Sequence, residues 1–234
     1  MKKILAIGNS FSQDATALLQ LLTDDLFVRN LYIGGCSLER HCNNIKSDER
    51  AYSYEENGAP LRREPISVKE ALLSDKWDYV TLQQVSGLSG IEESFYPYLS
   101  ELISYIRKYS SAEIVLHRTW AYEVDSTHGA FERYGSSQKK MHEAIVRTYD
   151  NVSKKENLKI IDVGSAIADL RTLPEFDYGN GGLSLCRDGF HLSFNYGRFV
   201  AAAVWCKFFT GKYPEIKETS PAFGAIKRYF KENE

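Results

Sequence analysis

The chain has 234 residues, of which 43% are hydrophobic, and its 29 basic and 31 acidic side chains leave a formal net charge of −2. This length and composition are enough to bury one sizeable core, so we expect a single domain over residues 1–234. Basic residues are spread along the chain rather than clustered, which argues against a protein that binds nucleic acid or a membrane surface.

The N-terminal apolar run at residues 4–7 predicts a buried strand rather than an export signal. The run is about half the length that export needs, and it continues into Gly8-Asn9-Ser10 with no small-residue cleavage site. No other apolar run approaches the roughly 18 residues of a membrane-spanning helix. We therefore expect a cytoplasmic protein, unless a leader has been removed.

Strand and helix patterns alternate along the rest of the chain. Strands are predicted at residues 26–33, 78–82, 113–116 and 159–163, and helices at residues 14–24, 95–109, 137–156 and 196–209, with one more beginning at the capping-box sequence Ser67-Val68-Lys69-Glu70. Strands that alternate with helices indicate a parallel sheet covered on both faces. The sequence thus predicts a three-layer α/β/α domain with a five-stranded parallel sheet.

Two segments interrupt this alternation. Residues 52–66 contain Asn57-Gly58 between alternating polar and apolar residues, which predicts an inserted β-hairpin. Residues 165–190 are predicted to form a long irregular connection, and such connections often carry function.

Four cysteines, at positions 36, 42, 186 and 206, predict neither a disulfide framework nor a metal site. Cys36 and Cys42 flank His41 with a spacing that fits no standard zinc site, and no second pair of ligands follows. We expect reduced thiols and no bound metal ion.

Small or polar residues follow each predicted strand. The carboxyl ends of parallel strands meet at one edge of a sheet, where ligands bind. The residues expected at this edge are Ser10, Gly35, Gln83, Gln84, Trp120, Asp188 and His191. Their convergence predicts an active site.

The chemistry of this group is that of a serine nucleophile. A serine hydroxyl needs a base to remove its proton, and His191, oriented by the carboxylate of Asp188, has the right chemistry. An isolated D-x-x-H sequence is more often a simple turn, so the pair alone is weak evidence.

The combination of motifs is more specific. GNSFS at residues 8–12 together with DGFHLS at residues 188–193 resembles the SGNH (GDSL-like) hydrolase superfamily. The wider set of LYIGGCSLERH, WDYVTLQQVSGLSG, TWAYEVDSTH and RDGFHLSFNYGR is similar to a bacterial branch described only as a domain of unknown function. The resemblance covers about residues 3–209. It implies a flavodoxin-like strand order, with Ser10 as nucleophile and Asp188 and His191 as its partners.

The resemblance also implies an oxyanion hole, and the chain departs from the family there. The backbone N–H groups of Ser10 and Gly35, or its neighbour Gly34, would be two donors. The family's third donor is an asparagine side chain, but this chain has Gln83-Gln84. A glutamine amide offers the same donor on a longer arm. We expect Gln84, or Gln83 if the register differs by one residue. The alternative is that both amides satisfy loop backbone groups.

The loop that follows the fourth predicted strand is expected to line the substrate groove with three side chains, those of Trp120, Tyr122 and His128. Packing of the loop is an equally good explanation for such aromatic residues.

The sequence as a whole predicts a serine esterase that forms an acyl-serine intermediate, with no metal ion or organic cofactor. The resemblance favours small-molecule or carbohydrate esters with short acyl groups such as acetyl. An acyltransferase that uses the same serine is one alternative. A non-catalytic carbohydrate- or metabolite-binding module is another, and a flavin or nucleotide binder is a third. The last is disfavoured because the first loop has a single glycine.

Overall fold

The computed structural model describes residues 1–234 and contains one sheet of seven strands. Five strands are parallel, namely β1 (Lys2–Gly8), β2 (Leu26–Tyr32), β5 (Tyr79–Leu82), β6 (Glu113–Arg118) and β7 (Lys159–Asp162). Two more, β3 (Ser53–Glu56) and β4 (Ala59–Pro60), are antiparallel and extend the sheet beside β2. The order is β4-β3-β2-β1-β5-β6-β7. The parallel strands therefore have the predicted flavodoxin-like order.

The prediction of five strands was wrong in number because the hairpin at residues 52–66 joins the sheet. Its turn, Asn57-Gly58, has φ values of 50° and 74°, which only a few residue types adopt without strain. The first strand of the hairpin, β3, pairs Glu55 with Asn30 of β2, so the hairpin covers an edge that a five-stranded sheet would leave open.

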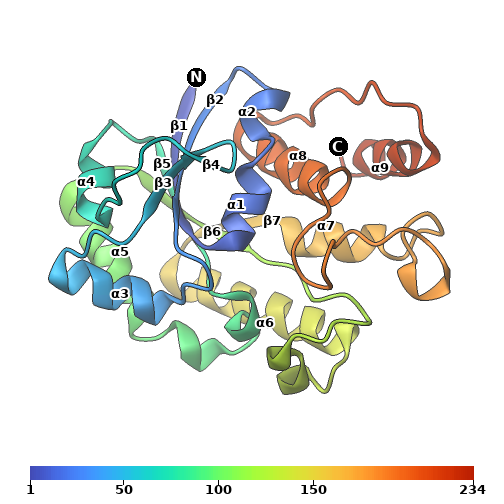
Figure 1. Cartoon of the computed structure of the whole chain (residues 1–234), viewed down its shortest axis with the longest axis horizontal. Coiled ribbons are helices and arrows are strands. Elements are labelled where there is room, and N and C mark those ends of the chain that lie inside the picture. Colours follow the sequence, from blue (N-terminus) through green and yellow to red (C-terminus); the bar gives the residue numbers. More distant parts are fainter.

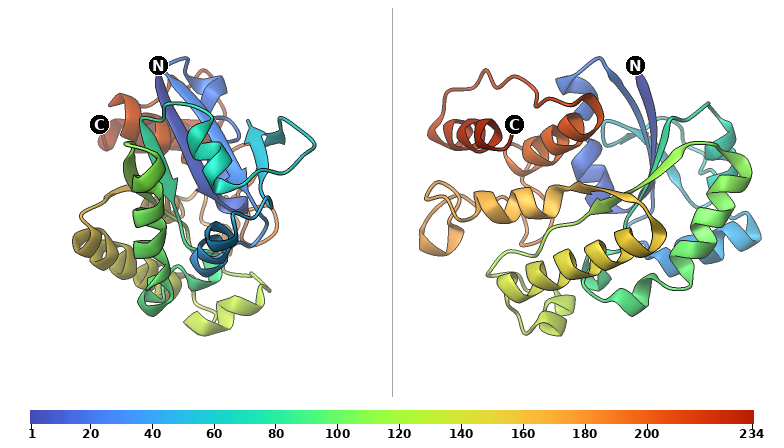
Figure 2. Two further views of the ribbon diagram at one scale, coloured as in Figure 1. Left: turned by 90° about the vertical axis from the view of Figure 1, so that its left-hand side faces the viewer. Right: turned by 180° about the vertical axis from the view of Figure 1, so that it is seen from behind.

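Nine α-helices accompany the sheet, and the two main groups lie on opposite faces. The helices are α1 (Ser10–Thr16), α2 (Leu19–Leu22), α3 (Leu38–Ser47), α4 (Val68–Leu73), α5 (Tyr98–Tyr109), α6 (Gln138–Glu156), α7 (Val163–Leu170), α8 (Gly197–Thr210) and α9 (Pro221–Glu232). Figure 1 shows α3, α4 and α5 on one side of the sheet and α1 and α8 on the other. The side view shows α4 and α5 in front of the strands (Figure 2, left). None of the helices is long and apolar enough to cross a bilayer.

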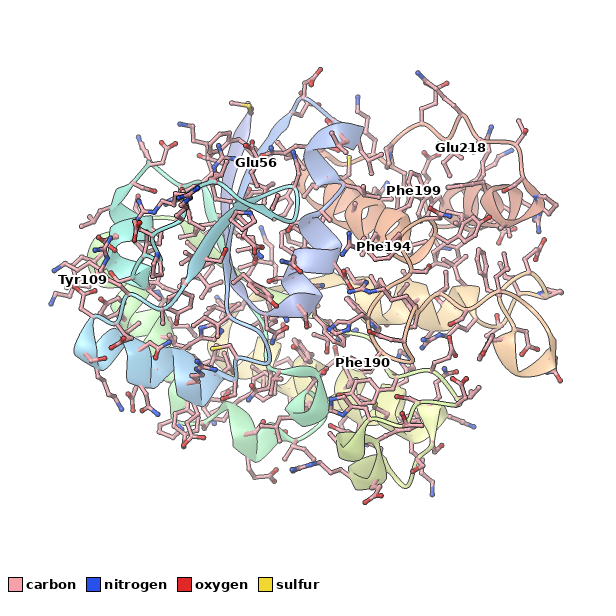
Figure 3. The ribbon with its side chains drawn as sticks, in the orientation of Figure 1. Glu56, Tyr109, Phe190, Phe194, Phe199 and Glu218 are labelled. Carbon is pink, nitrogen blue, oxygen red and sulfur yellow. The ribbon has the colours of Figure 1, made fainter.

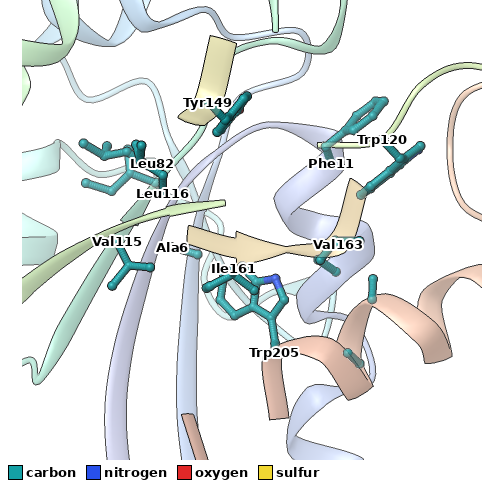
Figure 4. Close-up of a cluster of buried hydrophobic side chains, with 14 of the residues drawn as sticks. Ala6, Phe11, Leu82, Val115, Leu116, Trp120, Tyr149, Ile161, Val163 and Trp205 are labelled. Carbon is teal, nitrogen blue, oxygen red and sulfur yellow. The ribbon is translucent and has the colours of Figure 1, made fainter. Parts of the chain in front are cut away.

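The layers enclose one cluster of 65 buried hydrophobic residues. Residues 4–7 of β1 are all buried, as expected for a parallel strand covered on both faces. Tyr109 of α5 and Phe199 of α8 mark the two outer layers on opposite sides of the sheet (Figure 3). Trp205 of α8 and Tyr149 of α6 are fully buried and fill the space next to the strands (Figure 4).

Two predicted segments differ in detail. The helix predicted at residues 14–24 begins earlier, at Ser10, and is divided into α1 and α2. The irregular connection predicted at residues 165–190 begins with α7, because Asp162 caps this helix by accepting a hydrogen bond from the Ser165 N–H. All four cysteines are buried and unpaired.

Two histidines, His41 and His117, lie inside the core, and burial lowers the pKa of each to about 3. Both stay neutral in the folded protein while they bind a proton in the unfolded chain below about pH 6.5. Stability is therefore fully present above pH 6.5 and falls as the pH drops toward 3. We expect a loss of about 1.4 kcal/mol per pH unit for each histidine.

Urea unfolding at pH 6.5 and pH 5 tests this expectation. Replacement of His117 by Gln, which cannot be protonated, should reduce the stability difference between the two pH values by about 2 kcal/mol. An unchanged difference would show that His117 is not held neutral by burial.

Candidate active site

The end of β1 presents Ser10 at the carboxyl edge of the sheet. Gly8 ends the strand, and a Cβ atom there would lie 2.6 Å from Ser12 Oγ, so the chain needs glycine at this close approach. Ser10 is the first residue of α1 and is partly exposed. Ser12 is buried, with its hydroxyl 2.8 Å from Asn30 Oδ1. Of the two serines in this motif, Ser10 is therefore the one open to a substrate.

Asp188 and His191 are in direct contact, with Oδ2 of the carboxylate 2.7 Å from Nδ1 of the imidazole. The Asp188 Oδ1 atom accepts the backbone N–H of His191 at 2.8 Å, which closes a turn in which Gly189 has φ of +84°. The D-x-x-H sequence is thus both a turn and a carboxylate–imidazole pair. With Nδ1 donating to Asp188, Nε2 of His191 is left free to accept a proton.

The Asp188 carboxylate is 43% exposed, and opposing effects act on its pKa. Burial alone would raise the pKa, but the hydrogen bonds from the His191 imidazole and from the backbone of residues 190 and 191 lower it below its ordinary value. Asp188 is therefore ionised at neutral pH and suited to hold an imidazole in one orientation.

Aromatic rings link the His191 loop to α1. The imidazole lies 4.1 Å from the Phe190 ring and 6.1 Å from the ring of Phe11, centroid to centroid. Phe11 follows Ser10 directly, so the His191 ring lies next to the first turn of α1. Phe190 lies near the N-terminal end of α1 (Figure 3).

Trp120 and Tyr122 were predicted to line a substrate groove, and this prediction is wrong because both are fully buried. Trp120 stacks on Phe11 at 4.2 Å (Figure 4), and its indole N–H donates to the Phe190 carbonyl at 2.7 Å. The Tyr122 hydroxyl lies 2.8 Å from Ser86 Oγ. Both side chains hold the loops in place.

His128 is partly exposed and packs edge-on against Phe190 at 4.8 Å. Burial and the nearby His191 lower its pKa, and Asp188 opposes that effect. His128 is thus the member of the predicted groove that lies at the surface beside His191.

The turn after β2 carries a free backbone donor. The Cys36 N–H bonds the Ile33 carbonyl at 3.2 Å, and Gly35 within this turn has φ of +62° with open space where a Cβ would be. The N–H groups of Gly35 and Ser10 donate to no group of the protein. Both are therefore available to an oxyanion.

Gln84 is not placed to donate to an oxyanion. Its Nε2 donates to the Ser94 carbonyl at 2.9 Å and lies 3.1 Å from Ser94 Oγ. Its Oε1 accepts the N–H groups of Leu38 and Val85. The expectation that Gln84 donates to an oxyanion is therefore wrong. Its amide instead satisfies backbone groups of the neighbouring segments, as the alternative interpretation predicted.

Gln83 lies against the nucleophile loop instead. Its Nε2 donates to Asn9 Oδ1 at 2.8 Å, and its Oε1 lies 2.8 Å from His117 Nδ1. Because Oε1 only accepts, His117 must carry its proton on Nδ1. The Gln83 side chain thus connects the buried core to the residue before Ser10.

Asn9 is a buried residue next to Ser10 that the sequence analysis did not single out. Its Oδ1 caps α1 by accepting the Phe11 N–H at 3.0 Å, and its Nδ2 donates to the Cys36 carbonyl at 2.9 Å. One side chain therefore ties the Ser10 loop to the turn that carries Gly35. Its type, a turn-tolerant residue before the serine, gave no signal of this second contact.

The chain resembles known proteins over most of its length. Residues 3–220 match the family model "Domain of unknown function (DUF4886)". A DUF4886 protein from Bacteroides uniformis is 36% identical, with a TM-score of 0.87 over 97% of this chain and 92% of that chain. None of the curated proteins compared with the chain matches it.

Two more distant structures share the fold. A protein from Slackia heliotrinireducens assigned to the SGNH hydrolases is 23% identical, with a TM-score of 0.62 over 89% of this chain and 98% of that chain. The acetylxylan esterase Axe2 from Geobacillus stearothermophilus is 13% identical, with a TM-score of 0.55 over 88% of this chain and 93% of that chain. The chain therefore belongs to the DUF4886 family and has the fold of the SGNH hydrolases.

Proposed function

We propose that the protein is a serine esterase that hydrolyses carboxylic esters through an acyl-serine intermediate. The observation that carries the proposal is the contact of Asp188 Oδ2 with His191 Nδ1 at 2.7 Å, beside the loop that presents Ser10. A partly exposed serine, an imidazole with a free nitrogen and an orienting carboxylate are the groups that nucleophilic ester cleavage requires.

In the first step the Ser10 hydroxyl attacks the ester carbonyl while Nε2 of His191 takes its proton. Asp188 holds the imidazole by its Nδ1–H and stabilises the imidazolium. The tetrahedral intermediate collapses when His191 gives the proton to the leaving alcohol, and Ser10 keeps the acyl group. A water molecule, deprotonated by His191, then attacks the acyl-serine. The acyl–oxygen bond breaks, His191 returns the proton to the Ser10 oxygen, and the acid leaves.

Two backbone donors serve the oxyanion in this proposal, the N–H groups of Ser10 and Gly35. Each such donor contributes about 10²–10³ in rate when it is fixed before the reaction. Asn9 fixes them relative to each other, because it bonds both the start of α1 and the Cys36 carbonyl. Gln83 is the residue that orients Asn9.

We propose a short acyl group, such as acetyl, carried by a carbohydrate or a similarly polar alcohol. The space where a Gly35 side chain would be is open, which leaves room for a small group beside the donors. The likeness in fold to acetylxylan esterases is consistent with this substrate class. His128 would contact the substrate next to His191.

The test is hydrolysis of p-nitrophenyl acetate by the wild-type protein, with intact-mass and peptide-mass analysis after a fluorophosphonate probe. We expect turnover and one adduct per chain, mapped to Ser10. An adduct on another residue would overturn the assignment of the nucleophile. A protein that shows neither turnover nor an adduct would instead be a binding module.

A further inference from the structure

Asp14 is a fully buried carboxylate on α1, one helical turn after Ser10. Residues four apart lie on the same face of a helix. The Asp14 carboxylate therefore lies on the face of α1 that carries the proposed nucleophile. A carboxylate held away from water is costly unless it is paired and fully hydrogen-bonded, so its partners are informative.

All the charged partners of Asp14 come from the segment around His191. Arg187 Nη1 lies 3.0 Å from each carboxylate oxygen. Arg198, in the first turn of α8, donates to Oδ1 from Nε at 2.8 Å and from Nη2 at 2.7 Å. The carboxylate is thus bound by two guanidinium groups that lie on either side of His191 in the sequence.

The same carboxylate also bonds the backbone next to His191. The Leu192 N–H donates to Asp14 Oδ2 at 2.8 Å, and Arg187 donates to the Leu192 carbonyl. Leu192 follows His191 directly. Asp14 therefore binds the backbone N–H of Leu192, and Arg187 binds its carbonyl. Together they connect Leu192 to α1, the helix that begins with Ser10.

The ionic cluster of Asp14, Arg187 and Arg198 fixes the position of the His191 loop relative to α1. Apolar contacts alone would not fix it. Guanidinium N–H groups are planar and donate in fixed directions, so they accept a carboxylate in few arrangements. The neighbouring contact between the Phe11 and His191 rings is tilted, with centroids 6.1 Å apart, and it tolerates sliding. The ionic cluster of Asp14, Arg187 and Arg198 is therefore the directional link between α1 and the His191 loop.

We propose that Asp14, together with Arg187, is a positioning residue that holds His191 Nε2 at the Ser10 hydroxyl. The inference rests on the proposed esterase function and adds residues to it that touch neither the ester nor the reacting atoms. A misplacement of about 1 Å between reacting groups costs on the order of 10²-fold in rate, so loss of the cluster should slow the chemical step.

The test compares Asp14→Asn and Arg187→Gln with Asp150→Asn as a matched control. Asp14→Asn keeps the side-chain shape and removes the charge. Arg187→Gln removes a side chain that is 25% exposed, so this variant should fold even if Asp14→Asn does not. Asp150 pairs with a different buried arginine, Arg118, outside the Asp14 cluster.

Active sites are counted by endpoint fluorophosphonate labelling, and kcat is expressed per labelled site. We expect kcat for p-nitrophenyl acetate to fall about 10- to 100-fold in Asp14→Asn and Arg187→Gln, with KM within about threefold of the wild-type value. Asp150→Asn should lower the melting temperature and leave kcat per labelled site unchanged. A role in stability alone would reduce the number of labelled sites and not the turnover of each.

The inference would be overturned if Arg187→Gln and folded Asp14→Asn both kept the wild-type turnover per labelled site. The proposed esterase function would be unaffected by that result. An equal loss in Asp150→Asn would also overturn it, because the effect would then not be specific to this cluster. A wild-type protein with no turnover and no adduct would refute the esterase proposal itself, and the inference would fall with it.

Discussion

The Ser10→Ala variant should lose ester hydrolysis by at least about 10³-fold and acquire no fluorophosphonate adduct. The substitution removes only the hydroxyl oxygen, at a partly exposed position on the first residue of α1. The protein should therefore fold normally. Residual activity would come from the backbone donors acting on a water molecule, and it would appear without an acyl-enzyme burst.

Ser12→Ala is the matched control for this prediction. The two serines are two residues apart in one motif, but the Ser12 hydroxyl is buried between the Asn9 carbonyl and Asn30 Oδ1. We expect Ser12→Ala to be less stable by about 1 kcal/mol and to keep turnover per labelled site within about threefold. The assignment would be contradicted if Ser12→Ala lost labelling and Ser10→Ala kept it.

The second large effect is expected for Asp188→Asn, with a fall in kcat of about 10³- to 10⁴-fold. An amide at this position offers His191 Nδ1 a donor as readily as an acceptor, so the imidazole loses the tautomer that leaves Nε2 free. The lowered pKa of Asp188 keeps the wild-type carboxylate ionised in assays at pH 6–8. The loss should therefore be present throughout this range.

Asp125→Asn is the control for the second prediction. Asp125 is exposed and bonds the Tyr178 hydroxyl at 3.1 Å, on the loop that also carries His128. We expect its kcat to stay within about twofold of the wild-type value. Similar losses of kcat in Asp188→Asn and Asp125→Asn would indicate a general effect of removing negative charge from this region. They would not support a specific role of Asp188 in orienting His191.

The parallel strands were predictable because buried strands appear in the sequence as short, continuous apolar runs. The apolar residues 4–7 lie within β1, and the apolar residues 114–116, which follow the exposed Glu113, lie within β6. The pairing of the hairpin with β2 was not predictable. It joins Glu55 to Asn30, and local periodicity contains no information on which distant strand a hairpin will meet.

Candidate residues of the site could be predicted where their chemistry follows from residue type. They were misassigned where the role depends on the direction in which the side chain points. Ser10, Asp188 and His191 were predicted from their motifs. Asp188 and His191 are in contact, and the catalytic role of all three stays a prediction. Gln84 was misassigned because its partner, Ser94, lies in a later 3₁₀ helix (Glu92–Phe95) that the sequence analysis did not predict. Trp120 was misassigned because its exposure is decided by Phe11, more than 100 residues earlier.

The short strand β4 has a consequence for how the molecule behaves in solution. An open sheet edge with free backbone groups invites a second chain to pair with it, and the hairpin moves that edge from β2 to a strand of two residues. One of these is Pro60, which has no N–H to offer, and the chain continues into the charged pair Arg62-Arg63. The hairpin thus leaves few free backbone groups at this edge of the sheet, which disfavours edge-to-edge pairing with a second chain.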